Sequence, residues 1–103
     1  MIARHWIGTA KPECAERYLA HLQTDTFPNL ARLPGFLGAS VHRRDVPLGV
    51  EFRVVTEWQT LDAISAFAGP DISQAVIPAE VEEMMVEYDH TAVHYESVAA
   101  DPS

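Results

Sequence analysis

The sequence predicts an α+β domain with a ferredoxin-like βαββαβ order, in which a four-stranded antiparallel sheet carries both helices on one face. The first observation behind this prediction is the order of periodicities along the chain: alternating, helical, alternating, alternating, helical, alternating. The second is the length of 103 residues, which suits one domain, expected over residues 1–98 with a flexible tail over residues 99–103. The third is the hydrophobic content of 48%, which is enough for a modest core.

The first strand is expected over residues 2–9, and Pro12 marks the step into the first helix, because proline fits the first turn of a helix. Pro28 predicts a break or kink in this helix, since proline lacks the N–H group that a helix interior needs. Pro34 and Gly35 are typical of the turn into the next strand. Apolar residues at helical spacing predict one stripe that faces the sheet: Ala15, Tyr18, Leu19 and Leu22.

The second and third strands are expected over residues 36–45 and 50–58, and the turn between them makes the pair a hairpin. Thr60 is expected to cap the second helix, which Gly69 and Pro70 end. Shorter helical turns follow on both sides of a proline, over residues 71–77 and 79–86. The closing strand is expected over residues 91–98. The apolar stripe of the second helix consists of Leu61, Ile64 and Phe67.

Side-chain parity divides the predicted sheet into two faces, because successive residues of a strand project to opposite sides. One face is expected under the helices, and it collects Leu37, Ala39, Val41, Phe52, Val54, Trp58, Val93 and Tyr95. The opposite face carries charges of both signs among apolar residues, and it collects Phe36, His42, Arg44, Glu51, Arg53, Val55, Glu57, Ala92, His94 and Glu96.

The first strand fits either parity. If Ala3 and Ile7 join the core face, His5 joins them, and Arg4 and Trp6 lie on the mixed face. Aromatic rings and opposite charges together on one sheet face are typical of a self-complementary interface. We therefore expect a homodimer that packs through these sheet faces. The alternative is a monomer whose second face is exposed and charged.

Composition and charge exclude several classes of partner. The formal net charge of −8 argues against nucleic acids and anionic membranes, which bind clustered lysine and arginine. No apolar run approaches the roughly 20 residues that span a bilayer, and no secretory signal is visible, so we expect a cytoplasmic location. Cys14 is the single cysteine, which excludes an intrachain disulfide and a cysteine zinc site. No glycine-rich phosphate-binding motif is present.

Residues along most of the chain resemble the antibiotic biosynthesis monooxygenase family. The stretches that carry the resemblance are residues 34–38 leading into Arg43 and Arg44, Glu57 with Trp58, Ala63, Ile64, residues 66–69, Asp71, Ile72, Ala75, Val76 and residues 94–96. The resemblance implies a dimeric α+β barrel with a pocket inside each subunit, between helices and sheet. It also implies an activity among several, because the family includes cofactor-free oxygenases and haem-degrading enzymes.

Mapped onto this chain, the resemblance implies pocket walls made of His5, Tyr18, Leu22, Val41, Phe52, Trp58, Phe67 and Tyr95, with His21 at the helix edge. We expect His5 and Trp58 to be catalytic. The residues expected to bind substrate are Tyr18, Leu22, Val41, Phe52, Phe67 and Tyr95. An apolar cleft with a few polar groups is the usual form of a small-molecule site. The alternative is that these side chains simply fill the core.

The haem-degrading members imply a histidine iron ligand in the second helical region, where Ile77 stands in this chain, so no haem is expected. The cofactor-free members imply oxidation of a deprotonated phenol by dioxygen. His5 is the expected base, because imidazole titrates near neutral pH, and Trp58 would donate its N–H or stack on the substrate. No two histidines stand at i, i+4 on a predicted helix, so no metal is expected.

The expected function is therefore that of a cofactor-independent monooxygenase acting on a small aromatic or phenolic compound. The alternative is a non-catalytic barrel protein that binds a small ligand or serves in a stress response.

Overall fold

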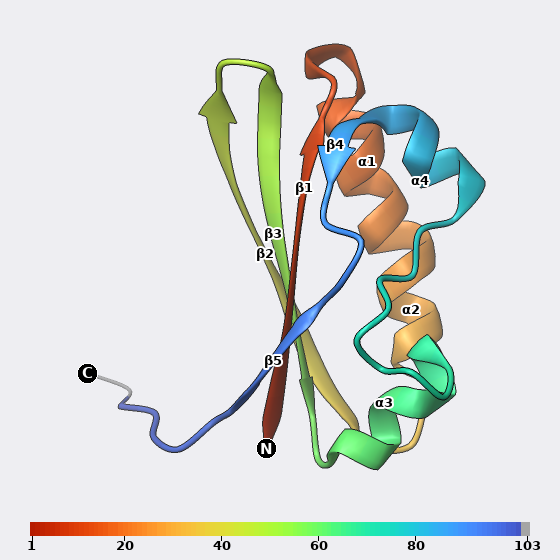
Figure 1. Ribbon diagram of the computed structural model, residues 1–103, viewed down its shortest axis with the longest axis vertical. Coiled ribbons are helices and arrows are strands. Elements are labelled where there is room, and N and C mark those ends of the chain that lie inside the picture. The colour runs from red at the N-terminus through yellow and green to blue at the C-terminus, as the bar shows by residue number, and fades with distance from the viewer. Residues whose placement is uncertain (102–103) are drawn as a thin grey trace.

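The structure is a computed structural model that describes residues 1–101. Its strands are β1 (Ile2–Ala10), β2 (Phe36–Val46), β3 (Gly49–Trp58), β4 (Met85–Tyr88) and β5 (Val93–Glu96). Its helical segments are η1 (Pro12–Cys14), α1 (Ala15–His21), η2 (Leu22–Thr26), α2 (Phe27–Leu30), α3 (Leu61–Ala68) and α4 (Ala79–Met84). The strands form one antiparallel sheet, and all four α-helices lie on the same side of it (Figure 1). The predicted α+β class and βαββαβ order are confirmed.

The sheet order is β2-β3-β1-β4, and β5 also pairs with β1. The closing strand predicted over residues 91–98 is present as the shorter β5, whereas β4 forms where the helical turns expected over residues 79–86 end. Residues 89–92 interrupt the strand pairing between β4 and β5. β4 pairs with the end of β1 near Ala10, and β5 pairs with its beginning near Ile2. The interruption has a backbone cause, because Ala75 donates its N–H to His90 and Ala92 donates to Ser73, so residues 73–75 lie beside residues 90–92.

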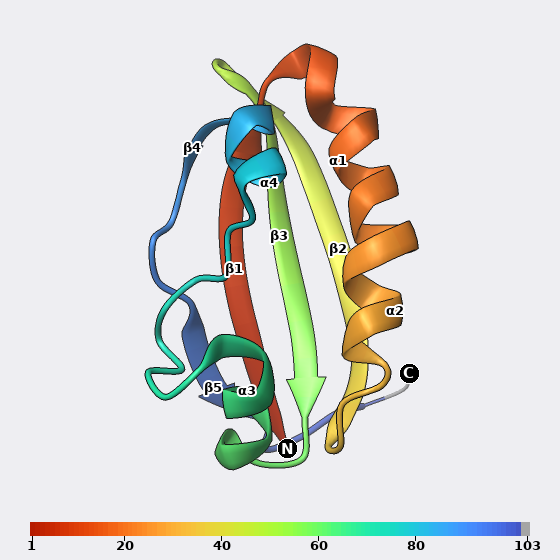
Figure 2. The same ribbon diagram turned by 90° about the vertical axis from the view of Figure 1, so that its right-hand side faces the viewer.

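The first helix does not break at Pro28. Instead, α1 passes into η2, a π-helical turn, and then into α2, so the helix runs on along the sheet (Figure 2). The N–H of Phe27 donates to the carbonyl of Leu22, five residues earlier. This wider turn accommodates Pro28, which has no N–H to donate to the helix. π turns of this kind occur often at functional sites.

The ends of α3 follow the prediction. Thr60 Oγ1 accepts a hydrogen bond from the N–H of Ala63 at 3.2 Å, which is the expected N-cap. Gly69 follows the helix with φ of +85°, a backbone conformation that other residues adopt only with strain. The length and position of α3 are therefore predictable from local residue types.

The register of β1 overturns the expected parity of this strand. Arg4 lies opposite Thr56 and Trp6 lies opposite Val54, on the helix-covered face. His5 lies opposite Val55 and therefore projects from the uncovered face, which we call the open face. The expectation that Ala3, His5 and Ile7 join the core face is wrong, because antiparallel pairing with β3 sets the parity of every residue in β1.

The same register corrects β5 and the start of β2. His94 lies opposite Arg4 and so faces the helices, whereas Tyr95 lies opposite Ala3 and faces away from them. Val93 and Tyr95 are 51% and 54% exposed, so both were wrongly assigned to the core face. At the start of β2 a bulge between Phe36 and Gly38 shifts the register, leaving the Phe36 ring 5.2 Å from that of Trp58 in the core.

The core has two parts. The first lies between the sheet and α1 with α4, and its fully buried centre includes Phe52 and Ala10. The second lies near α2 and α3, and it includes Trp58 and Ile64, both with no exposed area. Phe27 packs against both parts. Among residues 1–101, no helix is both long and apolar enough to cross a bilayer.

Candidate functional site

A cavity of about 320 Å³ lies between the sheet and the helices. This volume is near the lower end of the range of roughly 300–1,000 Å³ that small-molecule sites occupy. Its floor is formed by β1 and β3 through Arg4, Trp6, Val54 and Thr56. Its walls come from the first helix and the turn after it, from α3, and from the segment before α4 together with α4 itself. The wall residues are Tyr18, His21, Leu22, Asp25, Thr26, Phe27, Asn29, Leu30, Leu33, Ala66, Phe67, Ala75, Val76, Ile77, Pro78 and Val81.

Arg4 places a buried cation on the floor of this cavity, with only 4% of the residue exposed. Its guanidinium donates to the carbonyl of Ile72, to the carbonyl of Gln74 at 2.8 Å, and to Nε2 of His94 at 2.8 Å. Burial lowers the pKa of Arg4, yet a guanidinium keeps its charge in proteins. These bonds use three of its five N–H groups.

His94 is held neutral by this contact. Its Nε2 accepts a hydrogen from Arg4 and therefore carries no proton, so the proton of the ring resides on Nδ1. Burial first, and then the positive charge of Arg4, lower the pKa of His94 below its ordinary value of 6.5. His94 thus serves to orient Arg4.

Two aromatic residues beside Arg4 differ in what they offer a ligand. Trp6 donates its indole N–H to the carbonyl of Asp89 at 2.8 Å, so it presents only its ring to the cavity. Tyr18 is buried and packs edge to face on Phe52, with 5.0 Å between ring centres. Burial raises the pKa of the Tyr18 hydroxyl, which stays protonated and remains able to donate a hydrogen bond.

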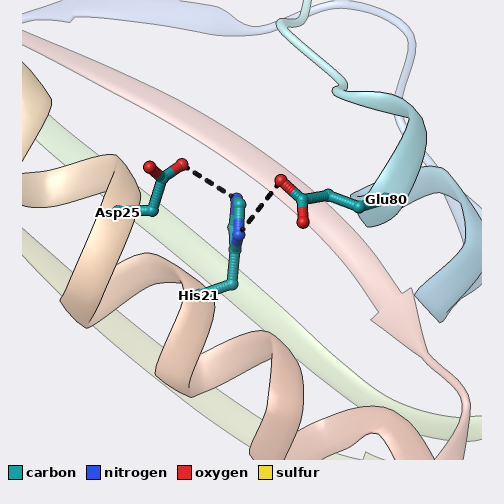
Figure 3. A group of neighbouring side chains, drawn as sticks. All are labelled: His21, Asp25 and Glu80. Atoms are coloured by element: carbon teal, nitrogen blue, oxygen red, sulfur yellow. Dashed lines mark ion pairs between the residues drawn. The ribbon is translucent and has the colours of Figure 1, made fainter.

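His21 brings an imidazole to the cavity wall. Its side chain is 8% exposed, and among residues 1–101 its Nε2 has no hydrogen-bond partner. Asp25 Oδ2 lies 3.8 Å from Nε2, and Glu80 Oε1 lies 3.7 Å from Nδ1, so two carboxylates flank the ring (Figure 3). Both distances exceed those of a direct hydrogen bond.

Of the residues that the sequence suggested for the pocket, Tyr18, Leu22 and Phe67 line the cavity. Trp58 is absent from its described lining and lies fully buried behind it, where its indole N–H donates to Thr56 Oγ1 at 2.8 Å. Val41 and Phe52 pack in the core part near α1, also outside that lining.

His5 and Tyr95 lie on the open face, and their rings make an edge contact with 4.9 Å between centres. Nδ1 of His5 lies 3.3 Å from Arg53 Nη1. Burial and then the Arg53 charge lower the pKa of His5, although Glu57 opposes them. The expectation that His5 and Trp58 share a chamber is therefore wrong, because the two side chains project from opposite sides of the sheet.

Sequence reasoning missed Arg4, Trp6 and Thr56, and it mentioned His21 only as a residue at the helix edge. The sequence did contain one signal. Both the odd and the even positions of the first strand include apolar residues, so either set can face the helices and line a pocket. Placing Arg4 and Trp6 on the cavity side required the register with β3.

The comparisons with known proteins agree with this fold. The family model of the antibiotic biosynthesis monooxygenases matches residues 1–79. A candidate antibiotic biosynthesis monooxygenase from Deinococcus radiodurans is similar with a TM-score of 0.69 and 20% sequence identity, over 100% of this chain and 98% of that chain. No match was found among the curated proteins.

Two further solved structures were determined with ligands. A monooxygenase from the ActVA-Orf6 gene of Streptomyces coelicolor, in complex with nanaomycin D, has a TM-score of 0.63 and 19% identity, over 99% of this chain and 92% of that chain. The haem degrader MhuD of Mycobacterium tuberculosis, with two haems bound in its active site, has a TM-score of 0.60 and 22% identity, over 98% of this chain and 99% of that chain. At such identities the likeness establishes the fold alone.

Proposed function

Because this chain belongs to the antibiotic biosynthesis monooxygenase family, we propose that it is a cofactor-independent monooxygenase of a small hydroxyaromatic compound bound in the cavity. In the proposed reaction a phenol and dioxygen give a quinone and water. One oxygen atom enters the ring, the other leaves as water with the two hydrogens that the phenol loses, and the substrate supplies all the electrons. The solved structure with nanaomycin D supports a bound small molecule for this fold.

The observation that carries the proposal is that a buried guanidinium, that of Arg4, and an imidazole, that of His21, both line one mainly apolar cavity. His21 has a ring nitrogen without a hydrogen-bond partner among residues 1–101, and such a nitrogen of a neutral imidazole can act as a general base. We therefore place the base at His21 instead of His5, which projects from the open face. A base of this kind contributes roughly 10²–10⁴-fold to a rate.

Arg4 is the group that would stabilise the phenolate once it forms. A fixed positive charge in a site with little water acts more strongly on an anion than it does in bulk solvent. The rings of Trp6 and Phe67 would hold the substrate between them, and the Tyr18 hydroxyl would donate to one of its oxygens. Trp58 cannot take the predicted donor role, since Thr56 already accepts its N–H.

A non-catalytic ligand-binding protein is the second candidate. The indole N–H groups of Trp6 and Trp58 are both engaged by protein acceptors, which reduces the donors available to developing charge. Tight binding of an aromatic compound without oxygen uptake would support this candidate over the enzyme.

We also propose that the open face pairs two copies of the chain. Val93 and Tyr95 are exposed there beside Arg53 and Glu57, and Glu57 Oε2 is buried without a hydrogen-bond partner within residues 1–101. A second copy would cover the exposed Val93 and Tyr95 side chains and offer Glu57 a donor. Light scattering should give a mass near twice 11.4 kDa, and a mass near 11.4 kDa would reject the dimer. The cytoplasmic location stays a prediction.

The test of the enzyme is oxygen uptake with a panel of hydroxynaphthalenes, compared between the wild type and three variants. We expect His21→Gln to lower kcat/KM by about 10²-fold or more, because it removes the base. His5→Gln and His90→Gln remove a histidine from the open face and from an exposed loop, and both should retain activity. Loss of activity in His5→Gln with full activity in His21→Gln would reverse the assignment.

A further inference from the structure

We propose that His21, Asp25 and Glu80 form a binding site for one divalent transition-metal ion, of which Zn²⁺ is the best-matched example, at the edge of the cavity. One ligand atom from each of these three residues lies within 4.8 Å of the other two (Figure 3). His21 ends α1, Asp25 lies four residues later in the π turn η2, and Glu80 lies in α4. Helices remote in the sequence thus bring the three side chains together.

The buried imidazole is the independent observation that points to a ligand. The His21 side chain is more than nine-tenths buried, yet within residues 1–101 its Nε2 has no hydrogen-bond partner. An unsatisfied buried nitrogen costs free energy that a bound ion would remove. The carboxylates stand 3.7 and 3.8 Å from the ring, too far for direct hydrogen bonds. These two distances involve different ring nitrogens, whereas one ion would use a single ligand atom from each residue, and three such atoms lie within 4.8 Å of one another. An ion about 2.0–2.2 Å from each of them would draw them together through side-chain rotations.

The ligand set selects the class of metal. One imidazole with two carboxylates suits Zn²⁺ and related transition ions, whereas Mg²⁺ and Ca²⁺ prefer oxygen ligands alone. Two carboxylates balance the charge of the ion. Three protein ligands leave a further coordination position for water or for an oxygen of a cavity ligand, and His21 and Asp25 both line the cavity.

The surroundings already orient one of the carboxylates. Asn29 Nδ2 donates to Asp25 Oδ1 at 3.2 Å, which leaves Oδ2 directed to His21. Metal-ligating carboxylates commonly have such a supporting hydrogen bond. The Asp25 and Glu80 side chains are 57% and 62% exposed, so an ion can reach them from solvent.

Binding would have two consequences. The ion would join the first helix to α4 across the cavity edge and so stabilise the folded state. It would also occupy the His21 nitrogen to which we assign the base, so zinc would inhibit the proposed oxygenation. The metal site does not rest on that proposed function, because metal binding is measured without any aromatic substrate.

The test is isothermal titration calorimetry of tag-free, chelator-treated protein with ZnCl₂, and with MgCl₂ for comparison. We expect one Zn²⁺ per chain, no heat from Mg²⁺, and a rise in Tm with zinc. Asp25→Asn and Glu80→Gln should each weaken zinc binding at least tenfold, and Asn29→Ala less. Glu83→Gln is the matched control, since it removes another exposed carboxylate from α4 and should bind as wild type.

Circular dichroism should show that the variants fold, since both substituted carboxylates are exposed. The proposal is overturned if the wild type takes up no zinc, or if Asp25→Asn and Glu80→Gln both bind zinc as tightly as the wild type does.

Discussion

Arg4→Met tests the assignment of the cavity floor most directly. Methionine keeps an unbranched stem of similar length, which can still pack near Phe67, but it removes the guanidinium that lies 5.7 Å from that ring. The carbonyls of Ile72 and Gln74 then lose a charged donor, and His94 loses its partner. The substitution therefore detaches the segment before α4 from β1.

The magnitude follows from these contacts. Hydrogen bonds to charged groups contribute about 1.5–3 kcal/mol each, so the two carbonyls alone suggest roughly 3–6 kcal/mol. Release of the guanidinium from its buried site offsets part of this, since burying a charge is unfavourable. We expect a loss of about 2–4 kcal/mol in the free energy of unfolding, or a fall in Tm of about 10 °C or more.

The assay is urea unfolding followed by circular dichroism, with Arg44→Met as the control. Arg44 lies on the open face, where it donates to Glu51 in an exposed ion pair, and its removal should leave stability unchanged within error. If the free energy of unfolding of Arg4→Met lies within about 0.5 kcal/mol of the wild-type value, the role assigned to the buried guanidinium is refuted.

Three further predictions test the turn, the core and the pH dependence. Gly35→Ala should lower stability more than Gly69→Ala in thermal unfolding, because both positions have positive φ but only at Gly35 would a Cβ lie 2.6 Å from Ala63 Cβ; equal losses would contradict this. Trp58→Ala should cost about 3–5 kcal/mol in urea unfolding, since the residue is fully buried, and a loss below about 1 kcal/mol would show that the site is not packed as described. The pKa of His94 is lowered in the folded state, so the unfolded chain binds the proton more tightly. The free energy of unfolding should therefore be highest above pH 6.5 and should fall as the pH drops below that value. Unfolding measured from pH 5 to 7.5 should therefore show a weaker pH dependence in His94→Gln than in wild type, and an unchanged slope would exclude His94 as the cause.

Local patterns predicted most of the elements. The cap at Thr60 and the glycine after α3 are local features, because each depends on residues within one helical turn. The break or kink predicted at Pro28 also depended on local residue types, yet the helix continues past this proline. The difference is that a π turn can bypass the missing N–H, and packing of Leu22 and Phe27 against the core keeps the helix on the sheet.

The candidate site was only partly predictable for the same reason. Tyr18, Leu22 and Phe67 were identified because helical spacing determines which side of a helix meets the sheet. His5 was misplaced because both parities of its strand carry apolar residues. The proposed metal group was not predicted, because Glu80 lies far from His21 and Asp25 in the sequence and only the folded chain brings α4 beside the first helix.

The amino-acid order alone determined the succession of strands and helices, since periodicity, caps and turn residues act over a few positions. Tertiary structure decided which side of β1 faces the cavity and how the last strand divides. Both depend on hydrogen bonds between distant segments, such as those from Arg4 to the carbonyls of Ile72 and Gln74. Moving a strand by one residue exchanges its faces, so only the assembled sheet could place Arg4 inside and His5 outside.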